Sequence, residues 1–170
     1  MDFRRRKDVE KVQSSGGVVY YFDKQTHEPK FLILKRHALS KKIERIAPKG
    51  KIKNGELPEQ AALREIEEEA WLKREYLQVK QVLDTLSLQL YNNYGKLWVD
   101  KDITYFLVHY SWDPDAVKVI HGEWFTGVYK RATLEELIIL IEYRDLRELF
   151  VQAYQSLWKI SVKDEFIKSL

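Results

Sequence analysis

Residues 50–72 read GKIKNGELPEQAALREIEEEAWL, and they hold the strongest signal in the sequence for both fold and function. Pro58 suits the first turn of a helix, and most of the residues that follow it are good helix formers. On a helix, Leu63, Ile66 and Ala70 form an apolar stripe along one side. The segment therefore predicts a helix that packs one face against a core.

The opposite side of this expected helix concentrates acids. Glu65, Glu68 and Glu69 fall within an arc of about 100° because of their helical spacing. Each like-charged pair costs about 0.2–0.5 kcal/mol, so the cluster needs a chemical reason. Carboxylates gathered in this way suit Mg²⁺ or Mn²⁺, which complete their coordination with water and substrate phosphate. The alternative is a solvated acidic surface, a role that we assign to Glu67 alone.

A turn-rich loop leads into the helix. Residues 47–56 (APKGKIKNGE) contain two glycines and an Asn-Gly pair, which are typical of turns. Glycine lets a ligand approach the backbone closely, and the lysines bring positive charge near that ligand. Lys49 and Lys51 are therefore candidate substrate-binding residues. Alone, the loop could be an ordinary lysine-rich hairpin; its spacing from the acidic helix favours a binding site.

Taken together, residues 50–72 resemble the Nudix box, whose pattern is G-x5-E-x7-R-E-U-x-E-E-x-G-U, where U is apolar. The positions in register are Gly50, Glu56, Arg64, Glu65, Ile66, Glu68, Glu69 and Leu72. One position departs, since Trp71 stands where the pattern has its second glycine. The resemblance implies an α/β fold of the Nudix type, an α/β/α sandwich with a mixed β-sheet.

The tryptophan affects the expected end of the helix. A glycine just past a helix usually adopts the left-handed conformation, which costs other residues about 1–2 kcal/mol. We therefore expect the helix to continue past Trp71 toward Arg74. The indole should then pack against the sheet or shape the edge of the site.

The resemblance implies Mg²⁺-dependent (or Mn²⁺-dependent) hydrolysis of a phosphoanhydride bond, in which water attacks one phosphorus and a phosphate leaves. We assign Glu68 and Glu69 as the principal metal ligands and Glu65 as a further ligand or a proton acceptor. The Gly50 carbonyl completes the metal shell. Glu123, from a neighbouring loop, is the candidate general base.

Two other residues of the box have supporting roles. The pattern implies that Glu56 either supports the metal shell or holds the loop to the helix. Arg64 is expected to pair with a glutamate of the box and to fix its position, rather than to touch the substrate.

Residues outside the box bear on the substrate. Residues 47–50 (APKG) and 101–107 (KDITYFL) resemble the subset of the family that acts on diadenosine polyphosphates and diphosphoinositol polyphosphates. In this subset a strand tyrosine stacks on adenine, so Tyr105 is either a base platform or a core residue. His37, just after an expected strand, is a candidate for the lining of the substrate cleft.

The leading substrate is a nucleoside diphosphate linked to another moiety, in particular a dinucleoside polyphosphate such as diadenosine tetraphosphate. Alternatives within enzymes are a diphosphoinositol polyphosphate, a nucleoside triphosphate or the 5′ end of an RNA. A different class of alternative is a Nudix fold that binds nucleotides without catalysis. That alternative predicts loss of the metal-binding acids, and all of them are present.

Composition limits the other possibilities. The 170 residues are 45% apolar, which fits one globular domain with a substantial core. A net charge of +3 is too small to indicate nucleic-acid binding, apart from RNA 5′ ends, and no apolar run is long enough for a membrane span. Residues 1–13 form a basic N-terminal extension without the features of a signal peptide. The absence of cysteine fits a cytoplasmic protein.

The remaining elements follow from hydrophobic periodicity. Strands are expected at residues 16–22, 30–36 and 123–129, and a hairpin at 77–91 and 97–110. Thr133 and Glu136 form a capping box before a helix over residues 137–143. A final amphipathic helix follows between residues 146 and 157. Residues 137–141 (LIILI) are either deeply buried or part of a homodimer interface.

Overall fold

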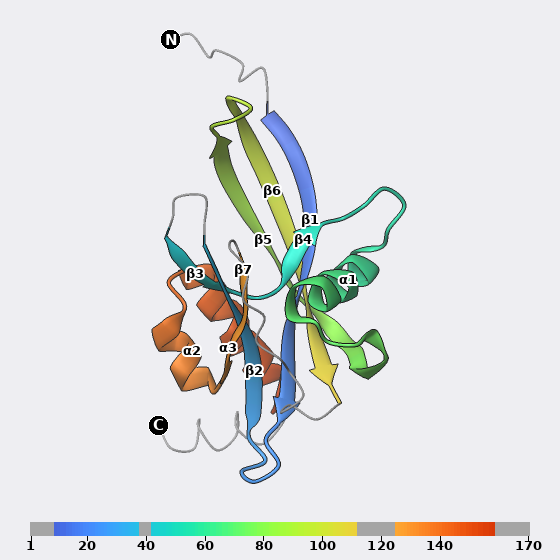
Figure 1. Cartoon of the computed structure of the whole chain (residues 1–170), viewed down its shortest axis with the longest axis vertical. Coiled ribbons are helices and arrows are strands. Elements are labelled where there is room, and N and C mark those ends of the chain that lie inside the picture. The colour runs from blue at the N-terminus through green and yellow to red at the C-terminus, as the bar shows by residue number, and fades with distance from the viewer. Residues whose placement is uncertain (1–8, 38–41, 112–124, 159–170) are drawn as a thin grey trace.

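A seven-stranded mixed sheet forms the centre of the molecule (Figure 1). The computed structural model describes residues 9–37, 42–111 and 125–158, without the side chains of residues 125–130. The strands are β1 (Val9–Phe22), β2 (Pro29–His37), β3 (Ile43–Ile46), β4 (Lys49–Lys51), β5 (Leu77–Asn92), β6 (Leu97–Tyr110) and β7 (Phe125–Ala132). The helices are α1 (Pro58–Ala70), α2 (Leu134–Leu140), α3 (Arg144–Leu157) and the short 3₁₀ helix η1 (Arg74–Tyr76).

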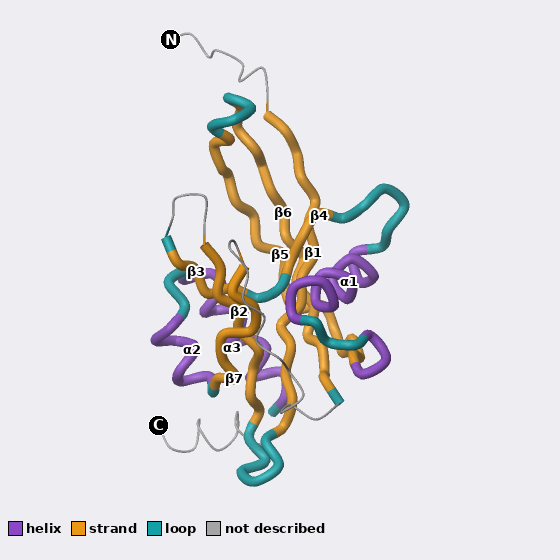
Figure 2. The backbone as a smooth tube through the Cα atoms, in the orientation of Figure 1, coloured by secondary structure: helices purple, strands orange, loops and turns teal. Residues whose placement is uncertain are grey.

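The order of the main strands is β3-β2-β1-β6-β5, with β4 also paired to β1 and β7 to β2. The β1–β6 pair is parallel, and the other pairs are antiparallel. Helix α1 lies on one side of the sheet, while α2 and α3 lie on the other (Figure 2). These layers confirm the expected α/β/α sandwich with a mixed sheet.

Two neighbouring glycines of β1 show how the strand serves both layers. Side chains alternate between the faces of a strand, so Gly16 and Gly17 face opposite sides. A Cβ at Gly17 would lie 2.5 Å from Ile66 of α1, whereas one at Gly16 would lie 2.9 Å from the ring of Tyr105. The glycines thus allow α1 to approach one face and the Tyr105 ring to approach the other.

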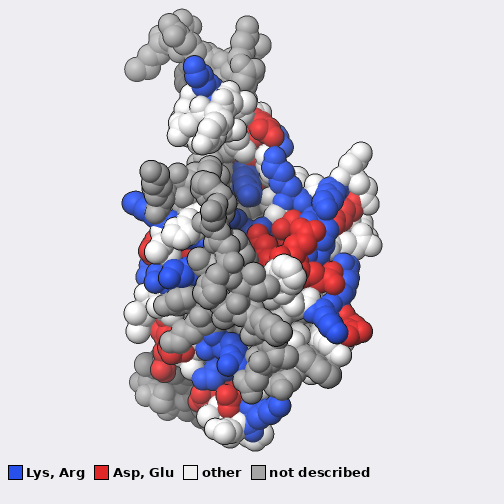
Figure 3. Space-filling view, viewed as in Figure 1, with Lys and Arg blue, Asp and Glu red and all other residues white. Residues whose placement is uncertain are grey.

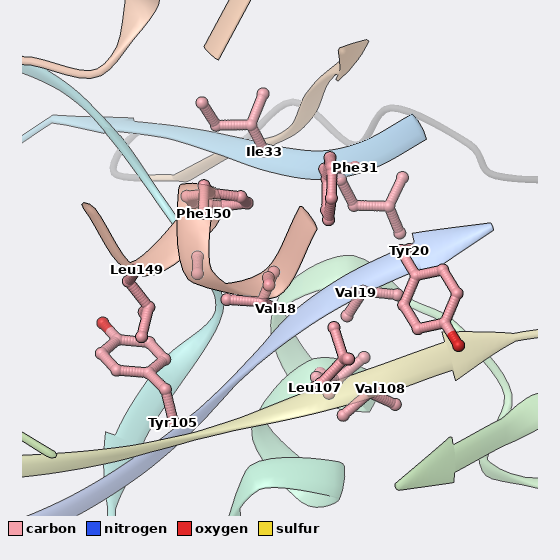
Figure 4. Packing of buried hydrophobic residues seen from close by; sticks show 14 of the residues in the cluster. Val18, Val19, Tyr20, Phe31, Ile33, Tyr105, Leu107, Val108, Leu149 and Phe150 are labelled. Carbon is pink, nitrogen blue, oxygen red and sulfur yellow. The ribbon is translucent and has the colours of Figure 1, made fainter. Parts of the chain in front are cut away.

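The core on the α3 side is built from large apolar residues. The rings of Phe31 and Phe150 pack edge to face with centroids 5.6 Å apart, and Figure 4 shows them with Val18 and Leu149. Full burial of one such side chain contributes about 1.5–3 kcal/mol. This packing fixes α3 against the sheet, and α3 follows directly after a loop that borders the candidate site.

The end of α1 corrects the sequence-based expectation. The helix stops at Ala70, and Trp71 adopts the left-handed conformation, with φ 56° and ψ 32°. Its N–H donates to the Glu67 carbonyl at 3.0 Å, and its side chain is 66% exposed rather than packed on the sheet. The helix stops because the chain must turn: Leu72 is buried in the core, and the Glu67 carboxylate accepts from the N–H of Arg74.

Several other elements match the sequence-based expectations, with shifted ends. The β5–β6 hairpin forms as expected and extends beyond the helices together with the start of β1 (Figure 1). Strand β1 begins at Val9, so residues 9–13 of the expected extension belong to the sheet, where they pair with residues 98–102 of β6. Thr133 and Glu136 form the expected capping box, although α2 begins three residues earlier than predicted, at Leu134. None of the helices in the described part of the chain is long and apolar enough to cross a membrane.

Residues 137–141 are only partly buried. Leu137 and Ile141 are buried in the core, which explains part of the apolar run. Ile138 is 42% exposed and Ile139 is 83% exposed.

Candidate active site

An arginine joins the turn-rich loop to α1. The Nε and Nη2 groups of Arg64 donate to the two carboxylate oxygens of Glu56 at 2.7 and 3.0 Å, and Nη2 also donates to the Lys51 carbonyl at 3.0 Å. Glu56 in turn accepts from the N–H of Lys53 at 2.9 Å. The hydrogen bonds from Arg64 and Lys53 lower the pKa of Glu56 to about 2. Glu56 therefore holds the loop to the helix, one of the two roles expected for it.

The same arginine contacts the acidic cluster. Its Nη1 lies 2.5 Å from a carboxylate oxygen of Glu65 and 3.2 Å from one of Glu68. Arg64 thus pairs with the glutamates around it, and its hydrogen bonds to Glu56 and Glu65 raise its own pKa. One cation offsets part of the repulsion among the neighbouring carboxylates, which is what allows them to remain close together.

Gly50 makes room for a carboxylate. A Cβ at this position would lie 2.1 Å from the Cδ of Glu65, which is closer than any real side chain could come. Gly50 sits in β4 opposite Ser15 of β1, and Glu65 is 9% exposed on the facing helix. Glycine is therefore required here by the close approach of Glu65 to the strand backbone, as the pattern of the loop suggested.

Glu69, in the last turn of α1, reaches the neighbouring strand. Its carboxylate accepts from the N–H of Lys49 at 3.0 Å. Burial raises the pKa of Glu69 to about 7, helped by the charge of Glu65, whereas the Lys49 N–H and the charges of Lys49 and Arg36 oppose the rise. Glu69 therefore stands between the acidic face of α1 and a group of cations.

These cations belong to a cavity of about 390 Å³ on the side of the sheet opposite α1. The charged residues that line it are four cations and two acids: Arg36, Lys49, Lys101, Arg144, Glu44 and Asp145. Burial, with repulsion from Arg36 and Lys101, lowers the pKa of Lys49 to about 8. Burial and repulsion from Arg36 and Lys51 also lower the pKa of Lys101. A site in which cations repel one another favours an anionic ligand.

An apolar wall adjoins the cations in this cavity, since Leu88 of β5 pairs directly with Lys101 of β6. Leu86, Leu88 and Leu90 alternate along β5 and therefore share one face, which borders the cavity together with Ile103. Tyr143, from the loop between α2 and α3, also lines it and is 46% exposed. The cavity combines positive charge, an apolar wall and the exposed aromatic ring of Tyr143, which suits a ligand with both a phosphate chain and a ring system.

The acidic cluster can be tested as a metal site by its donor set. Figure 3 shows acidic side chains gathered over α1, with lysines and arginines around them. Within the described part of the chain, no three His, Cys, Asp or Glu side chains already converge as a preformed cage. Hard divalent cations such as Mg²⁺ use one or two carboxylates and take their other ligands from water and substrate. The carboxylates of Glu65, Glu68 and Glu69 and the Gly50 carbonyl are hard oxygen donors, which is the chemistry that such a cation requires of one or two protein ligands.

The other expected site residues differ in where the structure places them. Tyr105 borders the cavity but is only 2% exposed, so it is a core residue, one of the two roles expected for it. His37 is exposed at the end of β2 and does not line the cavity. Lys51 is exposed and lies 3.9 Å from Glu10. Glu123 lies outside the described residues.

Sequence reasoning missed several residues that line the cavity. Arg36 lines the cavity and His37 does not, because adjacent residues of a strand face opposite sides. Lys101 shares a face with Ile103 and Tyr105, and that alternation could have identified it. Tyr143 had no local signal, because only the packing of α3 brings it to the cavity.

Comparisons with known proteins agree with this geometry. A family model described as NUDIX domain matches residues 13–152. A structure of a C. elegans Ap4A hydrolase binary complex has a TM-score of 0.69 and 27% identity, covering 88% of this chain and 99% of that one. A second C. elegans Ap4A hydrolase structure has a TM-score of 0.65 and 28% identity, covering 86% and 98%. The NUDIX domain of Shewanella oneidensis NrtR, complexed with ADP ribose, has a TM-score of 0.64 at 19% identity over 86% and 88%, a likeness of fold alone. Comparison with curated proteins gives no match.

Proposed function

This chain belongs to the Nudix family, and from that premise we propose that it is a Mg²⁺-dependent pyrophosphohydrolase of dinucleoside polyphosphates, with diadenosine tetraphosphate as the leading substrate. The family match and the hydrolase structures at 27–28% identity support hydrolysis of a phosphoanhydride bond. The observation that carries the choice of substrate is the cavity beside Glu69, because it joins a group of cations to an apolar wall.

Glu68 and Glu69 would hold Mg²⁺ (or Mn²⁺), with Glu65 and the Gly50 carbonyl completing the protein's share of the ligands. A bound cation of this kind neutralises phosphate oxygens and lowers the pKa of a coordinated water. Arg64 acts through its hydrogen bonds to Glu65 and Glu68, which orient these carboxylates before substrate arrives.

The residues of the cavity bind the rest of the phosphate chain. Arg36, Lys49 and Lys101 offset its negative charge, which lowers the cost of bringing a polyanion next to the glutamates. The side chain of Lys49 borders the cavity, and its main-chain N–H donates to Glu69. The phosphate chain of the substrate can therefore extend from the acidic cluster past Lys49 into the cavity. The proton of the attacking water goes to a carboxylate, either Glu65 or Glu123.

The apolar wall favours a nucleotide over the alternatives. A nucleobase can lie against Leu88 and Leu90, with the exposed ring of Tyr143 as an aromatic partner. A diphosphoinositol polyphosphate has no apolar ring and gains nothing from this wall. The likeness to Ap4A hydrolase at 27–28% identity supports a dinucleoside polyphosphate among the nucleotides.

A substrate panel tests this proposal. The purified chain is incubated with diadenosine tetraphosphate, ATP, ADP-ribose, a diphosphoinositol phosphate and a 5′-triphosphorylated RNA, with Mg²⁺ or with chelator, and the products are separated by chromatography. Glu69→Gln removes a proposed metal ligand, and Glu59→Gln is the matched control because Glu59 is an exposed acid in the first turn of the same helix.

We expect Mg²⁺-dependent cleavage of diadenosine tetraphosphate that is lost in Glu69→Gln and kept in Glu59→Gln. Preferred cleavage of another member would overturn the substrate. Absence of turnover for every member, with folded protein, would instead favour a nucleotide-binding module without catalysis.

A further inference from the structure

One carboxylate at the rim of the cavity is held from two sides by residues far apart in sequence. Glu44 of β3 faces Arg36 of β2 as a cross-strand pair, and the Nε of Arg36 donates to Glu44 Oε2 at 3.0 Å. The other oxygen, Oε1, accepts from the hydroxyl of Tyr143, which lies 99 residues further along the chain. Both oxygens of Glu44 are therefore used, and the plane of its carboxylate is fixed.

Glu44 and Arg36 differ in how far their side chains are buried. The side chain of Glu44 is 13% exposed, whereas that of Arg36 is 33% exposed. Burial would raise the pKa of Glu44, but the hydrogen bonds from Tyr143 and Arg36 outweigh it and lower the pKa below its usual value. Glu44 is thus an anchored anion, and Arg36 is the more accessible member of the pair.

The Nη1 and Nη2 groups of Arg36 can donate to a ligand. Its Nε is engaged by Glu44, and the described part of the chain offers no hydrogen-bond partner to Nη1 or Nη2. A guanidinium is a rigid planar fork, so holding Nε also sets the direction of the other four N–H bonds. Since Arg36 lines the cavity beside Lys49 and Lys101, these donors border the space where a phosphate chain would lie.

The negative charge of Glu44 offsets the repulsion between Arg36 and the lysines of the cavity. Burial lowers the pKa of Lys49 and of Lys101, and repulsion from Arg36 lowers the pKa of both lysines further. Without a carboxylate bound to its Nε, the flexible and partly exposed side chain of Arg36 would turn away from the two lysines and into solvent. An ordinary surface ion pair contributes little to stability, and it requires no third residue to fix its carboxylate.

We propose that Glu44, locked by Tyr143, is a positioning residue that holds the guanidinium of Arg36 toward the cavity so that its terminal nitrogens bind non-bridging oxygens of a polyphosphate chain. The place of this chain in a hydrolytic reaction rests on the proposed function above. The binding of the polyphosphate itself does not, and it can be measured without turnover.

The test measures binding of inorganic tripolyphosphate by calorimetry, with chelator present so that no reaction occurs. We expect Arg36→Lys to weaken binding about tenfold, because a single ammonium cannot replace the two terminal nitrogens. Glu44→Gln should weaken binding by a similar factor, and Tyr143→Phe by about threefold. In a double-mutant cycle, Arg36→Lys combined with Glu44→Gln should be no weaker than Arg36→Lys alone, because both changes remove one interaction.

The sign of the Glu44→Gln effect separates positioning from simple electrostatics. Loss of a negative charge beside the cavity should by itself tighten binding of an anion. Glu142→Gln is the matched control, since Glu142 is an exposed acid next to Tyr143 that does not line the cavity. Unchanged or tighter binding in Glu44→Gln would overturn the proposal, as would additive effects in the double mutant. If Glu44→Gln does not fold, Tyr143→Phe decides, because that hydroxyl lies on a 46% exposed side chain.

Turnover adds an independent readout. In the panel above, Glu44→Gln and Tyr143→Phe should raise KM for diadenosine tetraphosphate and leave kcat nearly unchanged. Wild-type protein that binds tripolyphosphate but cleaves nothing would refute the hydrolase and leave the positioning role intact. Wild-type protein that cleaves normally, with binding insensitive to Glu44→Gln, would refute only the positioning role.

Discussion

The main-chain N–H of Lys49 donates a 3.0 Å hydrogen bond to the carboxylate of Glu69, and this bond ties the lysine- and glycine-rich strand β4 to the last turn of α1. The Lys49 side chain borders the cavity on the other side of the sheet. One residue thus connects the proposed metal ligands to the proposed phosphate-binding cations. A substitution among the metal ligands should therefore alter the phosphate-binding cations, and the reverse should also hold.

The charge of Glu69 should make the metal-free protein less stable at high pH. Its pKa is raised from 4.5 to about 7 in the fold, chiefly by burial, so the folded state binds this proton more tightly than the unfolded state does. The stabilising effect of the bound proton is largest below pH 4.5 and disappears as pH rises to about 7. In chelator, Glu69→Gln should therefore be more stable than wild type at pH 8 by about 3 kcal/mol, with little difference near pH 4.

Urea unfolding at several pH values measures this difference. Added Mg²⁺ should reverse it at pH 8, because a bound cation favours the charged carboxylate. Parallel stability curves for the two proteins between pH 4 and 8 would contradict the assignment of the raised pKa to Glu69.

Two glycines of the loop should respond differently to the same substitution. Gly50→Ala places a Cβ 2.1 Å from the carboxyl carbon of Glu65, so the strand or Glu65 must move, and we expect activity to fall at least a hundredfold. Gly55 has a φ of 76° but no neighbour within 4 Å of its would-be Cβ. Gly55→Ala should therefore cost about 1 kcal/mol of stability through backbone strain and leave kcat/KM unchanged.

Initial rates and unfolding midpoints, measured on both variants, separate the two effects. Equal losses of activity would mean that the loop tolerates no change in general, and that the close contact between Gly50 and Glu65 has no special importance.

Much of the fold could be predicted from the sequence because its signals are local. The apolar stripe of α1 and the capping box of Thr133 and Glu136 depend on residues three or four apart in the chain. The β5–β6 hairpin depends on two alternating runs joined by a short turn. The start of β1 was missed because residues 9–13 (VEKVQ) hold two valines three apart rather than an alternating pattern, and backbone pairing with β6 makes them a strand.

The site divides in the same way. The expected pairing of Arg64 with nearby glutamates is a contact between residues on one helix or its lead-in loop, and it could be read from spacing. The Glu44–Tyr143 contact joins residues 99 apart, and no periodicity encodes it. Trp71 shows that a local rule can fail as well, because burial of Leu72 outweighs the cost of a left-handed tryptophan.

Replacement of Trp71 by glycine should stabilise the protein. The left-handed conformation at φ 56° costs a non-glycine residue about 1–2 kcal/mol, and the 66% exposed indole recovers little of this through packing. Trp71→Gly should therefore raise the free energy of unfolding by about 1 kcal/mol, with kcat/KM within twofold of wild type. Trp71→Ala is the control, because alanine keeps the strain while it removes the indole.

Chemical denaturation of the three proteins, with initial rates on the same preparations, tests this expectation. If Trp71→Ala and Trp71→Gly were equally stable, backbone strain would not explain the effect. A large loss of activity in both would instead give the indole a role in the reaction.

Substitution of Arg64 should disturb the loop and the acidic cluster together. Its guanidinium binds Glu56 with two nitrogens while the third reaches Glu65 and Glu68, a set of contacts that one ammonium cannot reproduce. We expect Arg64→Lys to lower kcat/KM by about 10–100-fold, because the carboxylates lose their orientation. Arg74→Lys is the matched control. Arg74 begins η1, and its Nη1 lies 3.5 Å from Oε2 of Glu67, near the end of α1. This substitution should change kcat/KM less than twofold.

The pH dependence of stability gives Arg64 a second readout. The pKa of Glu56 is lowered to about 2 in the fold, mainly by Arg64, so the stability it contributes is complete above pH 4.5 and is lost as pH falls toward 2. In Arg64→Gln this contribution should shrink at neutral pH, and the thermal midpoint should fall less steeply between pH 4.5 and 2 than in wild type. Because Lys53 still donates to Glu56, some of the slope should remain. An unchanged slope in Arg64→Gln would mean that Arg64 does not set the pKa of Glu56, and that the loop is held to α1 by other contacts.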